Sequence, residues 1–496
     1  MRNSFYLCWV ILVLMAACRH SESIQSTEVF YTFGKDTLAV STVIDQLKVP
    51  WEILEGPNHS LWFNEQQGKV WSFNPKTGKR KLLLVLTDTY LDRTSGLLGM
   101  ALSHDMEKEP YLFLAYTSKV PGKKQVSRIV RYTYSLDTLI NPVVILEYPA
   151  WTSHFGARLK IAPDNKLMVT TGDGDQHENA QNIGSPNGKI LRFNLDGSVP
   201  DDNPIPGSPV WAWGLRNSQG LTYGLAGKWY ISEHGDAIED EVNMLRMGAN
   251  YGWPEVEGYV DTKKEQTFAM DSSIVPPLKA WTPTIAPAAI GAYNSDKVPG
   301  FRHSLILATL KQNALHILRM DDKGDRILAD SLLFEHEFGR LRSVCVTSDG
   351  EVYIGTSNKD WNPNGVPQKN DDRILRIRIA HKRDVKNQRV FQAIRPNAIK
   401  VGVNDAEHLY QNYCASCHKS DGNGVKNTFP SLNASVIVRK EDPQLLISTV
   451  LNGRKEMPAF NFLDKQQLAA ILTYVRDRFG DKKSAVTEQM IAESKK

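Results

Sequence analysis

Short stretches in which apolar and polar residues alternate, each followed by a Gly- or Asp-rich turn, fill most of the chain. Examples are "KLMVTTGDGD", "KWYISEHGDA" and "EVYIGTSNKD". Such a period of two is typical of half-buried β-strands. The strand cores fall near residues 62, 112, 168, 230, 306 and 353, at intervals of roughly 50 to 75 residues. Six such units predict a six-bladed β-propeller, with a β-sandwich and a right-handed β-helix as the competing interpretations.

The hydrophobic pattern changes to a helical period after residue 405. "DAEHLYQNYCASCH", "DPQLLISTVLNG" and "DKQQLAAILTYVRDRFG" each begin at an Asp that can cap a helix, and the last two end at a Gly. We therefore expect an all-β six-bladed β-propeller over residues 36–380, followed by a small all-α domain over residues 405–480. Residues 381–404 are basic with little apolar pattern, which predicts a linker, and residues 481–496 are expected to form a polar tail.

The first residues have the pattern of an export signal. A basic residue precedes an apolar run from about Phe5 to Ala17, which is too short to span a membrane comfortably. The run ends at "LMAAC", which resembles a bacterial lipobox. This predicts a lipoprotein signal peptide over residues 1–17, a lipid on Cys18 and a polar tether over residues 18–35. The protein is then expected on the periplasmic side of a bacterial membrane, attached only through its lipid; a plain cleaved signal peptide is the alternative.

Composition and charge narrow the range of partners. The chain has 496 residues, 41% hydrophobic and 23% charged, which is typical of a soluble globular protein with two or more domains. Its formal net charge is only +4 and it has no long basic tract, so we expect no nucleic-acid partner. Of its five cysteines, Cys8 would leave with the signal peptide and Cys345 lies in an apolar strand, so no structural disulfide is expected.

The sequence "CASCH" in the helical region carries the most specific chemistry of the chain. Cys414, Cys417 and His418 form C-x-x-C-H, in which two thiols attach a haem and the histidine binds its iron. Met457, in "NGRKEMPAF" between two predicted helices, is expected as the second iron ligand, with Met490 as a rival. The strings "MPAF" and "FPSL" make this domain similar to a small monohaem cytochrome c. A zinc or redox C-x-x-C is the alternative.

Six runs in the first domain occur in a fixed order. They are "GLLGMALSHDM", "SHFGARLKIAPDNKLMVTTGD", "GKILRFNLDGSVPDDNP", "WGLRNSQGL", "SEHGDAIEDEVNMLRMGANYGWPEVEGY" and "PTIAPAA". Through them, nearly all of residues 38–380 resembles the soluble quinoprotein sugar dehydrogenases. The resemblance implies a propeller enzyme that uses pyrroloquinoline quinone (PQQ) and Ca²⁺.

Two residues are the candidates for catalysis. Oxidation of an alcohol by hydride transfer needs a base for the hydroxyl proton and a cation for the developing charge. The resemblance implies that His154, in a loop before a predicted strand, is the base. It also implies that Arg216 faces the quinone oxygens. The alternative for His154 is a loop histidine with a backbone partner.

The three carboxylates of PQQ require a cluster of cations. The resemblance places Lys311, Arg340 and Arg342 at this cluster. The R-x-R spacing on an extended segment is expected to point both guanidinium groups to one face. The resemblance also assigns to the PQQ pocket Asn217, Thr94 and Ser153.

The resemblance further implies a calcium site built from oxygen ligands. Its expected members are the carbonyls of Gly235 and Asp236 together with Glu241 and Tyr251. The family often has a proline where this chain has Asp236. The difference changes the side chain but keeps the backbone carbonyl that would bind Ca²⁺. The run "GDGDQHEN" lacks the spacing of an EF-hand and is interpreted as a blade turn.

Several positions on the substrate side depart from soluble glucose dehydrogenase, namely Thr94 for Gln, Ser153 for Asp, and Lys279 and Thr282 for aromatic residues. Loss of a carboxylate next to His154 should leave that histidine less basic. Trp281 or Trp361 could replace the missing aromatic surface, or the substrate differs from glucose.

The function expected from these features is an aldose or alcohol dehydrogenase with an internal electron carrier. Electrons would pass from PQQ to the haem c one at a time, and then to an external cytochrome or copper protein. Two alternatives stay open. One is a non-enzymatic propeller that binds a glycan or a partner and carries a relay cytochrome, because fold alone does not determine function. The other is a dehydrogenase of the same family that acts on a non-sugar alcohol.

Overall fold

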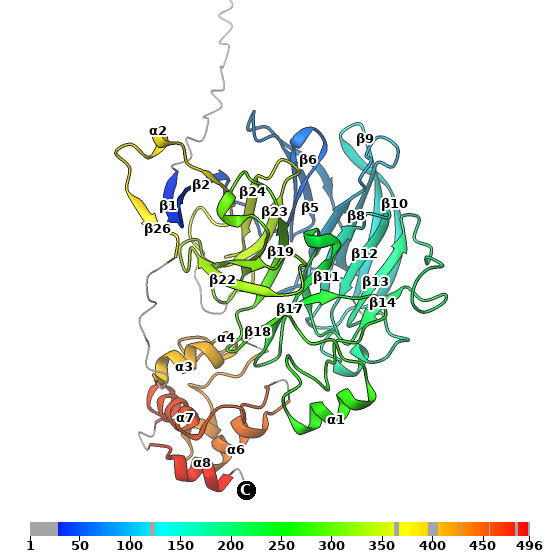
Figure 1. Ribbon diagram of the computed structural model, residues 1–496. Helices are drawn as coiled ribbons and strands as arrows, with labels where there is room; N and C mark the ends of the chain where they lie inside the picture. The colour runs from blue at the N-terminus through cyan, green and yellow to red at the C-terminus, as the bar shows by residue number, and fades with distance from the viewer. Residues whose placement is uncertain are drawn as a thin grey trace, which may run out of the picture.

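The computed structural model describes residues 28–119, 125–361, 367–394, 405–426, 428–455, 457–481 and 485–494. Figure 1 shows a ring of β-sheets, with a small helical domain at the C-terminus lying against one end of the ring. The six sheets confirm the predicted six-bladed β-propeller, and the helices confirm the small all-α domain. Cys18, the predicted lipid attachment residue, lies outside the described residues.

Five blades are four-stranded antiparallel sheets whose strands follow one another along the chain. Their strands are β3 (Pro50–Glu55), β4 (Leu61–Glu65), β5 (Lys69–Phe73) and β6 (Arg80–Val85); β7 (Leu97–Leu102), β8 (Tyr111–Ser118), β9 (Val126–Ser135) and β10 (Thr138–Pro149); β11 (Gly156–Ile161), β12 (Lys166–Thr171), β13 (Lys189–Asn194) and β14 (Val210–Trp213); β15 (Ser218–Tyr223), β16 (Trp229–Glu233), β17 (Asp240–Leu245) and β18 (Lys279–Trp281); and β19 (Pro287–Tyr293), β20 (Ser304–Thr309), β21 (Leu315–Met320) and β22 (Ile327–Leu333).

The sixth blade joins the two ends of the propeller chain, in the order β23-β24-β25-β2-β1-β26. Its strands are β1 (Val29–Phe33), β2 (Asp36–Ile44), β23 (Leu341–Val346), β24 (Val352–Thr356), β25 (Ile374–Ile379) and β26 (Val390–Gln392). The antiparallel pairing of β2 with β25 sets Ala39 opposite Arg378. Because an early strand completes a late sheet, the two ends of the propeller chain are joined and the ring closes, while each blade keeps short edge strands.

The second strand of each blade explains the six strand cores found in the sequence. Positions 62, 112, 168, 230, 306 and 353 lie in β4, β8, β12, β16, β20 and β24. These strands have neighbouring blades on both faces, and in β4, β20 and β24 every residue is buried. Burial on both faces favours continuous apolar runs, which makes these strands the easiest to recognise. Outer strands such as β6 and β10 are largely exposed, although their sequences also contain apolar residues.

Both ends of the propeller extend beyond the predicted boundaries. Strand β1 lies inside the segment predicted as a tether, and β26 lies inside the predicted linker and pairs with β1 in parallel. β1, with the sequence VFYTF, has the residue types of a strand, whereas the three-residue β26 is fully exposed and depends on its pairing with β1. The predicted loose tail contains α8 (Glu488–Ser494), whose Ile491 is buried in the helical domain.

The helical domain packs around α7 (Lys465–Phe479). Asp464 caps this helix through the backbone N–H of Gln467, and Asp405 caps α3 in the same way, as predicted from the sequence. The remaining helices of the domain are α3 (Ala406–Tyr413), α4 (Ala415–His418), α5 (Val436–Arg439) and α6 (Gln444–Asn452). The propeller adds α1 (Lys263–Asp271), α2 (Lys382–Val385) and the 3-10 turns Pro57–His59, His177–Ala180, Leu225–Gly227 and Pro299–Phe301. Among the described residues, no helix is both long enough and apolar enough to cross a membrane.

Candidate active site

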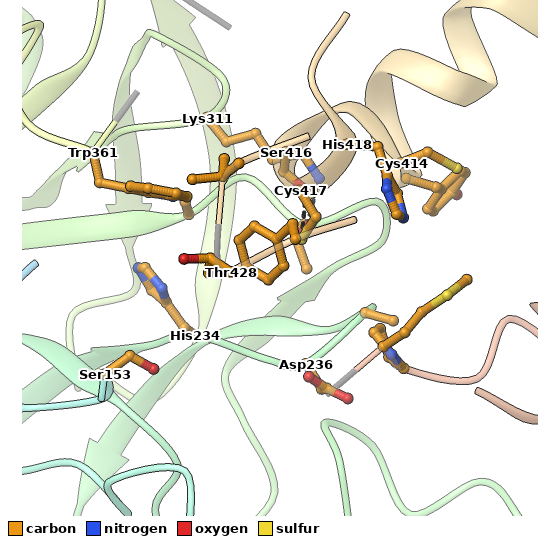
Figure 2. A pocket seen from close by; sticks show the side chains of 18 of the residues that line it. Ser153, His234, Asp236, Lys311, Trp361, Cys414, Ser416, Cys417, His418 and Thr428 are labelled. Carbon is orange, nitrogen blue, oxygen red and sulfur yellow. Dashed lines mark hydrogen bonds between the residues drawn. The ribbon is translucent and has the colours of Figure 1, made fainter. Parts of the chain in front are cut away.

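A cavity of about 1470 Å³ lies between the propeller and the helical domain and is lined by both. Figure 2 shows Ser153, His234, Asp236, Lys311 and Trp361 from the propeller side, and the haem-attachment segment from the helical side. The predicted catalytic and PQQ residues line this cavity: Thr94, Ser153, His154, Arg216, Asn217, Lys311, Arg340 and Arg342. The predicted haem residues line it too: Cys414, Cys417, His418 and Met457.

The inner strand of every blade is irregular in its pairing with the second strand. Within these register shifts lie four cavity-lining residues, Trp51, Leu98, Gln219 and Arg342. An extra residue in one strand bends it and changes the direction of a side chain. The side chains at the irregular starts of the inner strands thus form part of the cavity wall, while the rest of each blade stays regular.

His154 is held by two carboxylates. Its Nδ1 lies 2.8 Å from Asp173 Oδ1 and 3.1 Å from Asp175 Oδ1. With Nδ1–H donating to a carboxylate, Nε2 carries the free lone pair. The backbone of His154 is left-handed, with φ of 52°, and a Cβ on Gly172 would lie 1.9 Å from the His154 carbonyl oxygen, so this close approach requires glycine.

Ser153 supplies no carboxylate beside His154, as expected from the sequence, but two carboxylates reach this histidine from the loop after β12. Asp173 is fully buried and also accepts from Trp253 Nε1 at 2.9 Å. Burial alone would raise the pKa of Asp173, but the hydrogen bond and charge of His154 hold it below its usual range. Ser153 donates to Asp175, which joins the predicted pocket residue to the same network. The "GDGD" turn is therefore part of the site.

Arg216 has a donor group with nothing to bind in the described structure. Its Nη2 donates to Asp236 Oδ1 at 2.8 Å and its guanidinium lies 5.3 Å from the centre of the Trp253 ring. Its Nε is buried and has no hydrogen-bond partner among the described residues. A buried, unsatisfied donor such as Arg216 Nε favours a ligand oxygen at this point.

Asn217 supports the neighbouring backbone. Its Oδ1 accepts a hydrogen bond from Gly156 N at 3.1 Å, which stabilises the loop that carries His154.

The three predicted cations face the cavity. Lys311 Nζ donates to Thr284 Oγ1 at 2.6 Å, and burial lowers the pKa of Lys311. Burial likewise lowers the pKa of Arg340 to about 10. Arg340 and Arg342 share one carboxylate, Asp360. Arg342 sits at the irregular start of β23, so its direction is set by that irregularity and not by the regular strand alternation expected from the R-x-R spacing. Asp240, which also lines the cavity, acts on Lys311, and Asp372 acts on Arg340, so carboxylates compensate part of the charge of the three cations.

Three residues that the sequence suggested for the substrate side lie away from the cavity, namely Lys279, Trp281 and Thr282. Lys279 Nζ pairs with Asp330 at 2.6 Å and Trp281 packs its ring edge on His316, so neither belongs to the lining. Thr282 accepts a hydrogen bond from Glu239 N and does not line the cavity either. Trp361 does line it, which agrees with its suggested role as an aromatic surface.

The predicted calcium residues lie among buried acids. Gly235 and Asp236 line the cavity, whereas Glu241 and Tyr251 are buried behind it. Burial raises the pKa of Glu241 to about 7 and that of Glu257 to about 8. Asn243, which donates to Glu241 at 2.6 Å, has a buried side-chain oxygen without a partner among the described residues. Burial disfavours the ionised form of these two glutamates, and a bound cation would compensate their negative charge. The Asn243 oxygen is also a ligand type that a hard cation such as Ca²⁺ prefers.

The helical half of the cavity fits a covalently bound haem. Cys414 and Cys417 are free thiols at α4. His418 Nδ1 lies 2.9 Å from Pro430 O, which leaves Nε2 to face an iron. Met457 lines the same half. The same half is lined by both polar and apolar residues, and its apolar residues include Leu432, Ile437, Val438, Leu446, Val450, Phe460, Ile471, Leu472 and Val475.

The two halves of the cavity touch. The Phe429 ring lies 5.9 Å from the Trp361 ring, and Ala237 of the propeller packs against the core of the helical domain. Burial raises the pKa of the Cys414 and Cys417 thiols, and the nearby positive charge of Lys311 offsets part of this rise. The sequence analysis missed Asp360, which carries no motif, and it quoted Phe429 only as part of "FPSL" in the cytochrome c domain. Tertiary packing brings both residues to the cavity.

These features define a class of protein: β-propeller oxidoreductases that carry a cytochrome c domain in the same chain. The chain belongs to the glucose/sorbosone dehydrogenase family, whose family model matches residues 47–362. Residues 402–475 match the family of cbb3-type cytochrome c oxidase subunit III.

Individual relatives agree with both matches. Quinoprotein glucose dehydrogenase B of Acinetobacter calcoaceticus is 29% identical over 421 residues, which cover 67% of this chain and 87% of that protein. The solved PQQ-bound aldose sugar dehydrogenase of Streptomyces coelicolor aligns with a TM-score of 0.61 and 29% identity over 69% of this chain and 98% of its own. The fructose dehydrogenase cytochrome subunit of Gluconobacter japonicus is 32% identical over 112 residues, 20% of this chain and 23% of that protein.

Proposed function

We propose that the protein is a quinohaemoprotein dehydrogenase that oxidises an aldose or a related alcohol and passes the electrons to its own haem c. One observation carries the proposal: His154 and Arg216 share a single cavity with Cys414, Cys417 and His418. Because both redox groups would bind in one enclosure, electrons need no diffusing carrier between them. The names of the relatives, a glucose dehydrogenase and an aldose sugar dehydrogenase, suggest the substrate class.

The propeller half of the cavity suits a tricarboxylate quinone. Lys311, Arg340 and Arg342 would bind the PQQ carboxylates, since planar guanidinium groups match carboxylates in two hydrogen bonds. Arg216 Nε, which has no partner in the described residues, would donate to a PQQ oxygen. The PQQ pocket would be completed by Asn217, Thr94 and Ser153, which line the same cavity.

The chemistry divides between the cofactors and the protein. When bound, PQQ supplies an acceptor for the hydride of the alcohol carbon, and haem c supplies a one-electron carrier. His154 takes the hydroxyl proton at Nε2, because Asp173 and Asp175 hold its Nδ1–H and stabilise the imidazolium that forms. Arg216 places positive charge beside the oxygen on which negative charge develops.

We assign Ca²⁺ to the carbonyls of Gly235 and Asp236 with Glu241 and Tyr251. The support is the buried acidic surroundings, in which the pKa of Glu241 is raised to about 7. A divalent cation next to the quinone would also draw electron density from it, as a Lewis acid does.

On the exit side, Cys414 and Cys417 would hold the haem by thioethers, with His418 and Met457 on the iron. A second protein ligand closes the iron to small molecules, which suits a carrier and not a site of ligand activation. The final acceptor would be an external one-electron protein, a cytochrome or a copper protein. Attachment at Cys18 would keep the enzyme at the periplasmic side of a bacterial membrane.

The test uses the full-length protein with its haem attached. Protein loaded with PQQ and Ca²⁺ is mixed with a panel of aldoses and simple alcohols, and reduction of the haem is followed by its absorbance. We expect at least one aldose to reduce the haem, and no reduction by the same sugar when PQQ is left out. If no member of the panel reduces the haem, the proposal is wrong; if only non-sugar alcohols do, the substrate class is wrong.

A further inference from the structure

Part of the cytochrome domain covers the catalytic end of the propeller. Thr428, Phe429 and Pro430, here called the roof segment, line the same cavity as His154. Figure 2 shows Thr428 on the cytochrome side of the cavity, facing Trp361 and His234 of the propeller. The Phe429 ring meets Trp361 edge-on, with ring centres 5.9 Å apart and planes at 61°.

The roof segment is fixed relative to the haem ligand. Phe429 and Val425 exchange two backbone hydrogen bonds, each of 2.9 Å, and Thr428 N donates to Val425 O at 3.0 Å. The carbonyl of Pro430 lies 2.9 Å from His418 Nδ1. The position of Phe429 over the propeller is therefore determined by the same backbone that orients the iron-binding histidine.

The propeller alone offers little aromatic surface to a ligand. Two of its aromatic residues in the cavity wall, Trp51 and Phe155, are 2% and 6% exposed. Trp51 is covered by the guanidinium of Arg158, 4.2 Å from the ring centre. Trp361 is only partly buried, as is Phe429 across the cavity. These two half-buried rings face each other where the two domains meet.

A sugar presents hydroxyl groups at its edge and an apolar C–H face. Aromatic rings fit that face, and polar side chains fit the edge. Ser153, Asp175 and Arg93 line the polar part of the cavity, with the Arg93 guanidinium 5.8 Å from the Trp361 ring centre. The polar groups and the aromatic pair thus lie on one continuous wall, and half of the aromatic pair belongs to the cytochrome domain.

We propose that the roof segment is a wall of the sugar site, in which Phe429 and Trp361 pack on the apolar face of the sugar oxidised at His154. The cytochrome domain then sets substrate affinity as well as carrying electrons. This inference rests on the proposed function. The glucose/sorbosone dehydrogenase family model matches residues 47–362, so Phe429 lies outside the region that the model matches.

The test separates substrate binding from electron transfer. Full-length wild type, Phe429→Ala, Phe429→Leu and the control Phe462→Ala are loaded with PQQ and Ca²⁺, and haem content is checked by absorbance. Phe462 is a partly buried aromatic residue of the same domain that packs on Phe460 and does not line the cavity. Each protein is titrated calorimetrically with the 1-deoxy analogue of its best aldose, which binds but lacks the hydroxyl to be oxidised. Turnover of the aldose is measured with a phenazine dye and, separately, by haem reduction.

We expect Phe429→Ala to weaken binding of the 1-deoxy sugar about fivefold to tenfold, as loss of an aromatic packing surface does. The ratio kcat/KM should fall by a similar factor with the dye and with the haem, Phe429→Leu should lie between, and Phe462→Ala should match the wild type. Wild-type affinity in Phe429→Ala, or slower haem reduction with unchanged dye kinetics, would overturn the inference. Absence of haem reduction in the wild type with every aldose would instead overturn the proposed function.

Discussion

Replacement of Asp173 by Asn tests how His154 is oriented. In the structure Asp173 Oδ1 accepts from His154 Nδ1 at 2.8 Å and from Asp175 N at 2.9 Å, while Oδ2 accepts from Trp253 Nε1 at 2.9 Å. All three partners are donors when Nε2 of His154 is free to act as a base. An amide has only one acceptor oxygen, so in Asp173→Asn at least one donor must face an NH₂ group, which costs about 1–3 kcal/mol in a buried site.

The amide has two orientations, and they have opposite effects on His154. If NH₂ faces Trp253, the histidine keeps its Nδ1–H and stays a base. If NH₂ faces His154, the proton moves to Nε2 and the base is lost. Because a general base contributes roughly 10²- to 10⁴-fold, we expect Asp173→Asn to reduce kcat by about 10²-fold. The loss stays near the low end because Asp175 Oδ1, 3.1 Å from Nδ1, still holds the Nδ1–H tautomer.

The double variant Asp173→Asn/Asp175→Asn removes both carboxylates, and its kcat should fall to the level of His154→Ala, about 10⁴-fold below the wild type. The assay is dye-linked turnover at saturating sugar, with PQQ affinity and thermal unfolding measured on the same samples to confirm an intact site. Asp175→Asn alone is the matched control and should lose less than tenfold. A double variant that turns over within threefold of the wild type would refute the assignment of His154 as an oriented base.

Four further predictions follow. Lys311→Ala removes a cation from the PQQ pocket and should weaken PQQ binding roughly 10- to 100-fold by titration, without changing the haem spectrum. Burial lowers the pKa of His234 to about 3, with the charges of Arg216 and His154 adding to the effect; the unfolded chain binds more protons below about pH 6.5, so stability falls there with falling pH, and His234→Gln should flatten the dependence of Tm on pH between about 4 and 6.5. Met457→Ala should lower the haem potential and allow carbon monoxide to bind the reduced haem; unchanged carbon monoxide reactivity would exclude Met457 as a ligand. Chelation by EDTA should lower Tm and abolish haem reduction by sugar, both restored by Ca²⁺ and not by Mg²⁺.

The propeller could be predicted because its second strands are buried on both faces. β20 (SLILAT) and β24 (VYIGT) each have an apolar core that is buried throughout, and the spacing of such cores along the chain gives the blade repeat. The terminal strands β1 and β26 fell inside a predicted tether and a predicted linker, because their pairing joins two distant parts of the chain, which no local pattern records. A strand can be predicted from its own sequence only where its burial is reflected in its own apolar residues and does not depend on a distant pairing partner.

The site could be predicted where one motif carries several ligands. Cys414, Cys417 and His418 lie together in sequence, so spacing alone predicts their common role. The carboxylates around His154 were missed because they come from a different loop, although "GDGD" directly after a predicted strand was a usable signal. The contact of Trp361 with Phe429 depends on how two domains dock, which no local pattern records.

Direct electron transfer within one chain is tested most directly by rapid mixing. Protein loaded with PQQ and Ca²⁺ is mixed with an excess of its best aldose, and haem reduction is followed at protein concentrations that differ by about tenfold. Transfer inside the shared cavity predicts a first-order rate constant that does not depend on protein concentration. A rate that rises in proportion to protein concentration, or a haem that stays oxidised while the dye-linked assay shows turnover, would contradict it.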